Sequence, residues 1–198
     1  MNKCLVIFVE GETEEEFYKL LVQNARNLTE TKTNCIDVEI VNVKGIGGFK
    51  SIALRKFKNR VKPKFGKDCQ FIVALCRDTD VFEFEAKPSI DWKKLESEFK
   101  ANGANKVIHV EAKLSIEDWF LIDLEGVLNF LKLPQNTKCR GKNGVDKLSK
   151  LFQKVNKVYV KGNRCNLLIK SINIEKIATS VSDQLLPLYK VLGVKQSR

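Results

Sequence analysis

The chain has 198 residues, which is enough for one hydrophobic core or for one domain with a modest appendage. Its composition, 43% hydrophobic and 30% charged, is that of a globular protein and argues against disorder. With 35 Lys and Arg against 24 Asp and Glu residues the formal net charge is +11, which favours a polyanionic partner such as DNA or RNA.

The six cysteines are scattered and form no C-x-x-C pair, so nothing supports a zinc ribbon or a redox motif. Cys4 and Cys76 lie within apolar runs, and we expect both to be buried. No secretory signal pattern is recognisable, and no apolar stretch is long enough to span a bilayer. The sequence therefore predicts a cytoplasmic protein with reduced thiols and no membrane partner.

The first predicted unit is a strand, a tight acidic turn and a helix. Residues 5–9 are continuously apolar, as in a strand buried on both faces of a parallel sheet. Gly11 permits a sharp turn, and Thr13 with Glu16 forms a capping box for the helix that follows.

A second strand is predicted over residues 37–43, followed by the glycine-rich run 44–50. This run lacks both nucleotide-binding glycine patterns, so it is read as a loop beside the site, with a phosphate cradle as the alternative. A basic helix is expected to begin at Ser51 and to stop before Pro63.

Further strands are predicted over residues 70–76 and 106–110, each followed by a helix. The first of these helices is expected to begin at Pro88-Ser89. The second is expected to begin at a capping box of Ser115 and Asp118 and to end at Pro134.

This alternation indicates an α/β fold with a mostly parallel four-stranded sheet flanked by helices. Residues 1–132 would form this core. Residues 133–198 would form a basic, mainly helical extension packed on it, with two or three helices and at most one short strand near residues 158–160.

Two aspartates follow the third predicted strand. In an extended segment Asp78 and Asp80 would point to the same side, with Thr79 turned away. Carboxylates this close repel each other and are stabilised by a cation. Oxygen ligands without clustered His or Cys favour Mg²⁺ or Mn²⁺, whereas the plainer alternative is a solvated acidic turn.

Glu10 ends a separate buried strand. Because the carboxyl ends of parallel strands share one edge of a sheet, Glu10 can converge with Asp78 and Asp80 into a metal site. Glu14 is retained as an accessory ligand, although acids in a helix's first turn are favoured without any function. Glu12 is read as a solvent-facing turn residue.

The run Val9-Glu10-Gly11-Glu12-Thr13-Glu14, with Asp78-Thr79-Asp80 after a later strand, resembles the Toprim domain, a Rossmannoid metal-binding module of topoisomerases, primases and nucleases. Together with the run from Lys113 to Phe120, the sequence looks most like stand-alone Toprim nucleases of the OLD and RloB type, many of which are associated with phage defence. The resemblance covers about the first 125 residues.

The resemblance implies that Glu10 is a metal ligand or general acid/base, and that Asp78 and Asp80 hold Mg²⁺ or Mn²⁺ for phosphodiester chemistry. A second ion would recruit further acids, for which the candidates are Glu14, Glu111 and Glu117.

Three further residues near these motifs have predicted roles of their own. Arg77 departs from the family pattern, and pairing with Asp78 would make Asp80 the stronger ligand. Trp119 beside Glu117 is read mainly as core packing. His109, inside a strand, is expected to be packed or hydrogen-bonded rather than catalytic.

Basic residues cluster over 55–67 and 138–164, where they could neutralise phosphates along a bound strand. In the second cluster Lys161 or Arg164 is a candidate stabiliser of transition-state charge.

The leading hypothesis is a metal-dependent nuclease that cleaves DNA or RNA. The alternatives are a non-catalytic subunit acting with a partner ATPase or another defence protein, and a phosphohydrolase of the haloacid-dehalogenase kind, since Asp78-Thr79-Asp80 resembles its nucleophile pair. The sequence leaves the substrate, the number of ions and the oligomeric state open, with a homodimer among the alternatives.

Overall fold

The computed structural model describes residues 2–29, 36–66, 68–79, 90–162 and 165–194. Asp80, Arg164 and the predicted helix start at Pro88-Ser89 lie outside these residues.

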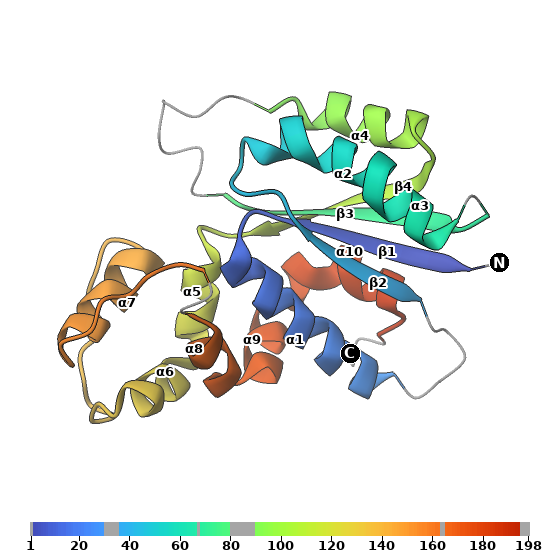
Figure 1. The fold of residues 1–198 in the computed structure, drawn as a ribbon. Helices are drawn as coiled ribbons and strands as arrows, with labels where there is room; N and C mark the ends of the chain where they lie inside the picture. The colour runs from blue at the N-terminus through green and yellow to red at the C-terminus, as the bar shows by residue number, and fades with distance from the viewer. Residues whose placement is uncertain (1, 30–35, 67, 80–89, 163–164, 195–198) are drawn as a thin grey trace.

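The sheet has four strands, all parallel, in the order β2-β1-β3-β4 (Figure 1). They are β1 (Lys3–Val9), β2 (Asp37–Asn42), β3 (Gln70–Asp78) and β4 (Ala104–Ala112). The predicted strands and the α/β fold class are confirmed. β3 runs two residues further than predicted because β4 pairs with it to its end, where Arg77 lies opposite Glu111 and Asp78 opposite Ala112.

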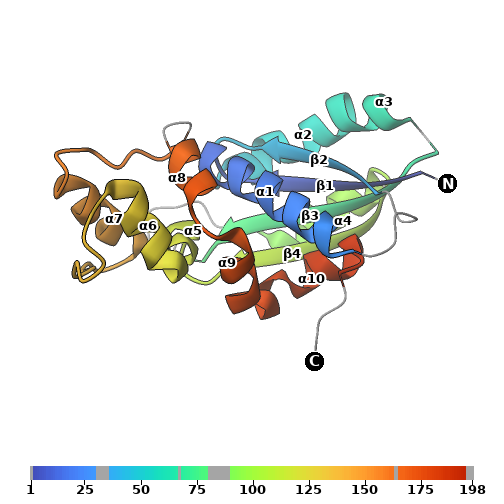
Figure 2. The ribbon, with the colours of Figure 1, turned by 90° about the horizontal axis from the view of Figure 1, so that it is seen from below.

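Helices cover both faces of the sheet (Figures 1 and 2). Alternate residues of β1 face opposite sides: Ile7 packs with helix α1 (Glu12–Leu28) and helix α10 (Ser182–Leu192), whereas Phe8 packs with helix α4 (Trp92–Ala101). A strand apolar at every position is therefore buried on both sides. Cys4 and Cys76 are buried, as predicted.

The basic helical run begins earlier and ends later than predicted. It consists of η1 (Phe49–Ala53), α2 (Leu54–Lys56), η2 (Phe57–Val61) and α3 (Lys62–Phe65), where η1 and η2 are π-helical. Its fully buried residues recur every four positions, at Phe49, Ala53, Phe57 and Val61. In a regular α-helix of 3.6 residues per turn, residues four positions apart would drift around the helix. The wider π turns keep these four residues on one face. Pro63 does not stop the run, because it occupies the first turn of α3.

The predicted capping box at the start of α1 is wrong. Gly11 is the N-cap, without a side-chain cap, and Thr13 is already inside the helix. Glu16 forms ion pairs with Lys19 and Lys170.

The helix predicted after β4 is interrupted. It consists of α5 (Ile116–Phe120), a 3₁₀ turn (Leu121–Asp123) and α6 (Leu124–Leu131). Ser115 is the N-cap of α5, but its hydroxyl donates to the Asp118 carboxylate at 2.8 Å and caps no backbone N–H. α4 begins at Trp92, where the Asp91 carboxylate accepts from the Lys94 N–H.

Within residues 133–162 and 165–194 the structure has four helices, where two or three were predicted: α7 (Gly144–Gln153), α8 (Asn166–Ser171), α9 (Ile174–Ser180) and α10. Residues 157–160 form no strand. α8, α9 and α10 share one hydrophobic cluster with α1, as the burial argument predicted. α7 lies away from the sheet and packs against α5 (Figure 1). The division at residue 132 remains a prediction.

No helix in the described part of the chain has both the length and the apolar character needed to cross a membrane.

Candidate functional site

Two carboxylates meet at the carboxyl edge of the sheet because β1 and β3 are neighbours. Glu10 directly follows β1, and Asp78 is the last residue of β3. The Asp78 N–H donates to Glu10 Oε1 at 3.1 Å. Asp78 Oδ1 in turn accepts from the Ile116 N–H at the start of α5, at 3.0 Å. The sheet edge therefore fixes both acids and joins them to α5.

Two further acids reach this edge from helices. Glu14 lies in the first turn of α1 with 8% of its surface exposed, and Glu117 lies in α5 and is fully buried. Both act electrostatically on Asp78. We call Glu10, Glu14, Asp78 and Glu117 the acidic cluster.

Two members of the acidic cluster, Asp78 and Glu14, have pKa values above those of isolated carboxylic acids. Burial, followed by the charges of Glu14, Glu10 and Glu117, raises the pKa of Asp78 to about 9, against a smaller opposing effect of Lys161. Burial also raises the pKa of Glu14, against opposing backbone N–H groups and Lys161. Without a bound cation, Asp78 is therefore protonated at neutral pH.

Lys161 supplies a positive charge to this cluster. Its Nζ lies 3.1 Å from Glu117 Oε1, and the Tyr159 hydroxyl donates to the same oxygen at 3.0 Å. Burial alone would lower the pKa of Lys161, but the charges of Glu117, Asp78 and Glu14 raise it overall. Glu117 Oε2 is buried and has no hydrogen-bond partner among the described residues.

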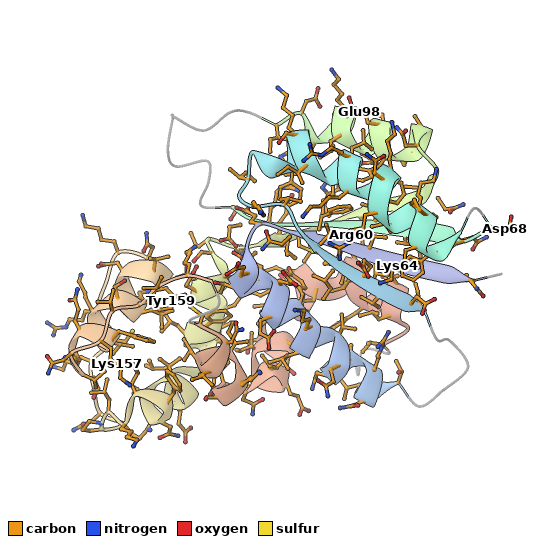
Figure 3. All side chains as sticks on the ribbon, viewed as in Figure 1. Arg60, Lys64, Asp68, Glu98, Lys157 and Tyr159 are labelled. Carbon is orange, nitrogen blue, oxygen red and sulfur yellow. The ribbon has the colours of Figure 1, made fainter. Side chains whose placement is uncertain are left out.

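The segment after α7 is anchored to α1 and α5. Gly162 has a left-handed φ of 96° and donates its N–H to Thr13 Oγ1 at 2.7 Å. Figure 3 marks Tyr159, which is buried, and Lys157, which is exposed, in this segment. Thr13 thus holds the C-terminal extension against the first turn of α1.

An open cavity of about 540 Å³ borders the acidic cluster. Its lining includes Glu10, Glu14, Asp78 and Lys161, together with Asn42 at the end of β2 and Lys44 and Gly45 in the loop that follows. The Gly45 N–H donates to the Glu10 backbone carbonyl at 2.6 Å. The glycine-rich run therefore forms part of the rim, beside the site as predicted.

Arg77 does not pair with Asp78, so that expectation is wrong. Consecutive strand residues point to opposite faces, and Arg77 instead pairs with Glu111, contacts His109 Nδ1 at 2.8 Å and lies 4.0 Å from the Trp92 ring centroid. Glu111 is therefore engaged away from the acidic cluster, and the packed, hydrogen-bonded role expected for His109 agrees with these contacts.

The predicted site residues divide into three groups. Glu10, Glu14, Asp78, Glu117 and Lys161 lie together. Glu111 lies elsewhere, and Asp80 and Arg164 are outside the described residues.

The chemistry of the acidic cluster fits a hard cation. All four side chains are carboxylates, which Mg²⁺ and Mn²⁺ prefer, and a cation would offset both the burial and the repulsion that raise the pKa of Asp78. Glu117 Oε2, which has no hydrogen-bond partner among the described residues, is a further oxygen that could ligate an ion. Within residues 2–29, 36–66, 68–79, 90–162 and 165–194, however, no three His, Cys, Asp or Glu side chains are arranged closely enough to hold an ion together. Ligation would therefore require these side chains to move closer or Asp80 to contribute.

Sequence reasoning missed two supporting residues. Thr13 was assigned to a helix cap but binds the C-terminal extension, and Tyr159, which binds Glu117, was not among the predicted site residues. The aromatic between Lys157 and Lys161 was the available signal for Tyr159, but its partner lies 42 positions away.

Comparisons with known proteins give one structural similarity. No protein-family model and no curated protein matches the sequence. Among solved structures, the chain is similar to the C-terminal region of the Xanthomonas campestris pv. campestris OLD protein, with a TM-score of 0.46 and 12% identity over 97% of this chain and 94% of that one. At this TM-score and identity the similarity carries no conclusion about activity.

Proposed function

We propose that this chain is a metal-dependent nuclease that hydrolyses phosphodiester bonds of DNA or RNA. The observation that carries the proposal is the acidic cluster at the carboxyl edge of the parallel sheet, beside an open cavity and in contact with Lys161. Ligands bind at this edge in open α/β sheets. The net charge of +11 supports a polyanionic substrate. The resemblance to Toprim nucleases adds phage defence or nucleic-acid processing as the setting.

Glu10 and Asp78 would hold Mg²⁺ or Mn²⁺, with Glu14, Glu117 and Asp80 as further donors. When bound, the ion would act as a Lewis acid on the phosphate and would favour the ionised form of Asp78. This donor set contains oxygen only, which matches the ligand preference of both ions.

The remaining groups act through charge and position. The Glu10 carboxylate, which accepts from the Asp78 N–H, would accept a proton from the attacking water. The Lys161 ammonium, half exposed at the cavity, would stabilise negative charge that develops on the phosphate. Tyr159 and Thr13 keep the segment that carries Lys161 in place.

The test is cleavage of single-stranded DNA, duplex DNA and RNA with Mg²⁺ or Mn²⁺. We expect Glu10→Gln and Asp78→Asn to lower the cleavage rate at least about a hundredfold, as loss of a general base or an electrostatic group does. Glu175→Gln, at an exposed position of α9, is the matched control and should retain wild-type activity. Metal-stimulated cleavage that survives both site substitutions would show that the site is wrongly assigned.

A second candidate is a non-catalytic subunit that binds nucleic acid and acts with a partner ATPase. It is favoured by the finding that, in the part of the chain that the structure describes, no three potential ligands are close enough to share an ion. Binding of nucleic acid by the wild-type chain without cleavage under any metal condition would support this candidate and contradict the stand-alone nuclease.

A further inference from the structure

We propose that a second, basic cavity binds the phosphate backbone of a nucleic acid strand. This cavity, which we call the basic cleft, has a volume of about 690 Å³. It is lined by α7 and the segment before it, through Lys138, Arg140, Lys150, Leu151, Gln153 and Lys154. None of these residues lines the cavity at the acidic cluster.

The charge around the basic cleft is unbalanced. Residues 138–162 contain eight Lys and Arg residues and a single acid, Asp146. That carboxylate is already engaged by Lys150 Nζ and by the Lys142 N–H, both at 2.8 Å. In the described part of the chain, Lys138, Arg140 and Lys154 have no carboxylate within ion-pair distance. Cations gathered in a concave surface without counter-charges attract a polyanion.

The other basic region of the chain is partly neutralised by the protein itself. Arg60 and Lys64 lie on the helical run from Phe49 to Phe65 (Figure 3). Both bind the Glu39 carboxylate, at 3.0 and 2.6 Å. Lys62 donates to a backbone carbonyl at 2.8 Å. Two cations of this run are therefore neutralised within the protein, whereas Lys138, Arg140 and Lys154 line one concave surface without a carboxylate partner among the described residues, which favours the basic cleft as the docking surface.

The lining of the basic cleft favours phosphates, because four of its six residues are Lys or Arg. Among the described residues, the lining contains no aromatic side chain on which a base could stack. Its apolar member, Leu151, is 1% exposed. Contacts from Lys and Arg to phosphate oxygens carry no sequence information, so we infer binding through the backbone that is independent of sequence.

Both ends of α7 connect the basic cleft to the acidic cluster. At its start, Gly144 packs so closely on α5 that an added Cβ would lie 2.5 Å from the Asp118 backbone nitrogen and 2.7 Å from the Glu117 carbonyl carbon. Beyond its end, Tyr159 and Lys161 bind Glu117. The two cavities thus belong to one packed unit. The idea that a strand held in the basic cleft is presented to the acidic cluster rests on the proposed function, whereas binding itself does not.

The test compares two variants with equal charge. The cleft variant is Lys138→Gln/Arg140→Gln/Lys154→Gln, and the control is Lys58→Gln/Lys93→Gln/Lys94→Gln. The control residues are exposed and lie on η2 and α4, which cover the face of the sheet opposite to α1 and α10. Binding of fluorescein-labelled single-stranded and duplex DNA of mixed sequence is measured in EDTA, so that no cleavage contributes. Circular dichroism and the Tm verify folding.

We expect the cleft variant to bind DNA at least about tenfold more weakly than the control at low salt. The slope of log Kd against log salt should fall by about 2.1 to 2.7, because each of three lost phosphate contacts contributes about 0.7 to 0.9. Lys138→Arg/Lys154→Arg should bind like wild type. Equal weakening in both Gln variants would overturn the proposal, as would wild-type binding of pyrophosphate with none of DNA. A chain that binds DNA through the basic cleft but never cleaves it would contradict the proposed function alone.

Discussion

The Nζ of Lys161 lies 3.1 Å from Oε1 of Glu117, a carboxylate with no solvent exposure. The two residues come from different parts of the chain, Glu117 from α5 after the last strand and Lys161 from the segment after α7. A buried carboxylate requires a partner. The C-terminal extension supplies this partner through Lys161 and thereby becomes part of the candidate site.

Lys161→Met should bind divalent cations more tightly than wild type. The ammonium offsets the negative charge of the acidic cluster, so its removal strengthens attraction for Mn²⁺ by about tenfold, which corresponds to about 1.4 kcal/mol. Isothermal titration with Mn²⁺ measures the change directly. Lys161→Arg, which retains the charge, is the control. Unchanged Mn²⁺ affinity in Lys161→Met would show that Lys161 does not compete with a cation.

Asp78 makes folding stability depend on pH in a defined window. Its pKa is 3.8 in its ordinary state and about 9 when folded. Between these values the unfolded chain has lost a proton that the folded chain keeps, so the contribution of Asp78 to stability falls as pH rises.

Asp78→Asn removes this titration. Without metal, the variant should gain stability relative to wild type by more than about 1.4 kcal/mol, the equivalent of one pKa unit, as the pH rises from about 4 to about 9. Urea unfolding in EDTA across this range measures the difference. Added Mn²⁺ should stabilise wild type and leave the variant unaffected. If the difference in unfolding free energy between Asp78→Asn and wild type does not vary with pH, the pKa of Asp78 is not raised.

Tyr159→Phe should destabilise the protein by about 1.5 to 3 kcal/mol, because the Tyr159 hydroxyl donates to a buried charged group. The loss leaves Glu117 with fewer donors and removes one contact that holds the segment after α7. Urea unfolding at neutral pH measures the effect. Val158→Ala is the control, since that side chain is 79% exposed. Equal stability of both variants would mean that the hydrogen bond contributes nothing.

Gly144→Ala should destabilise the protein by about 1 to 3 kcal/mol, as overpacking does. The added Cβ would meet the backbone of α5 at 2.5 Å, so α7 or α5 must move. Gly47→Ala is the matched control, because nothing lies within 4 Å of its Cβ position. Thermal unfolding compares the two. If Gly144→Ala also weakens Mn²⁺ binding, the packing of α7 positions Glu117; a Tm equal to that of Gly47→Ala would contradict the close contact.

Local sequence pattern predicted the sheet well and the helix ends poorly. Strands apolar at every position can only be buried on both faces, and this alone indicated the parallel sheet. The boundaries at Thr13, Ser51 and Pro63 were wrong because helix ends depend on hydrogen bonds and packing from elsewhere. Thr13 is the clearest case, because its hydroxyl accepts a hydrogen bond from the Gly162 N–H, 149 positions away in the sequence.

The sequence by itself determined that Glu10 and Asp78 reach one edge of the sheet, because each closely follows an apolar run and parallel strands end together. The tertiary structure decided which other charges join them. Strand alternation turned Arg77 and Glu111 away, whereas the packing of α5 and of the segment after α7 brought Glu117, Tyr159 and Lys161 together. Contacts over such separations depend on how helices pack against the sheet, and no local pattern records that packing.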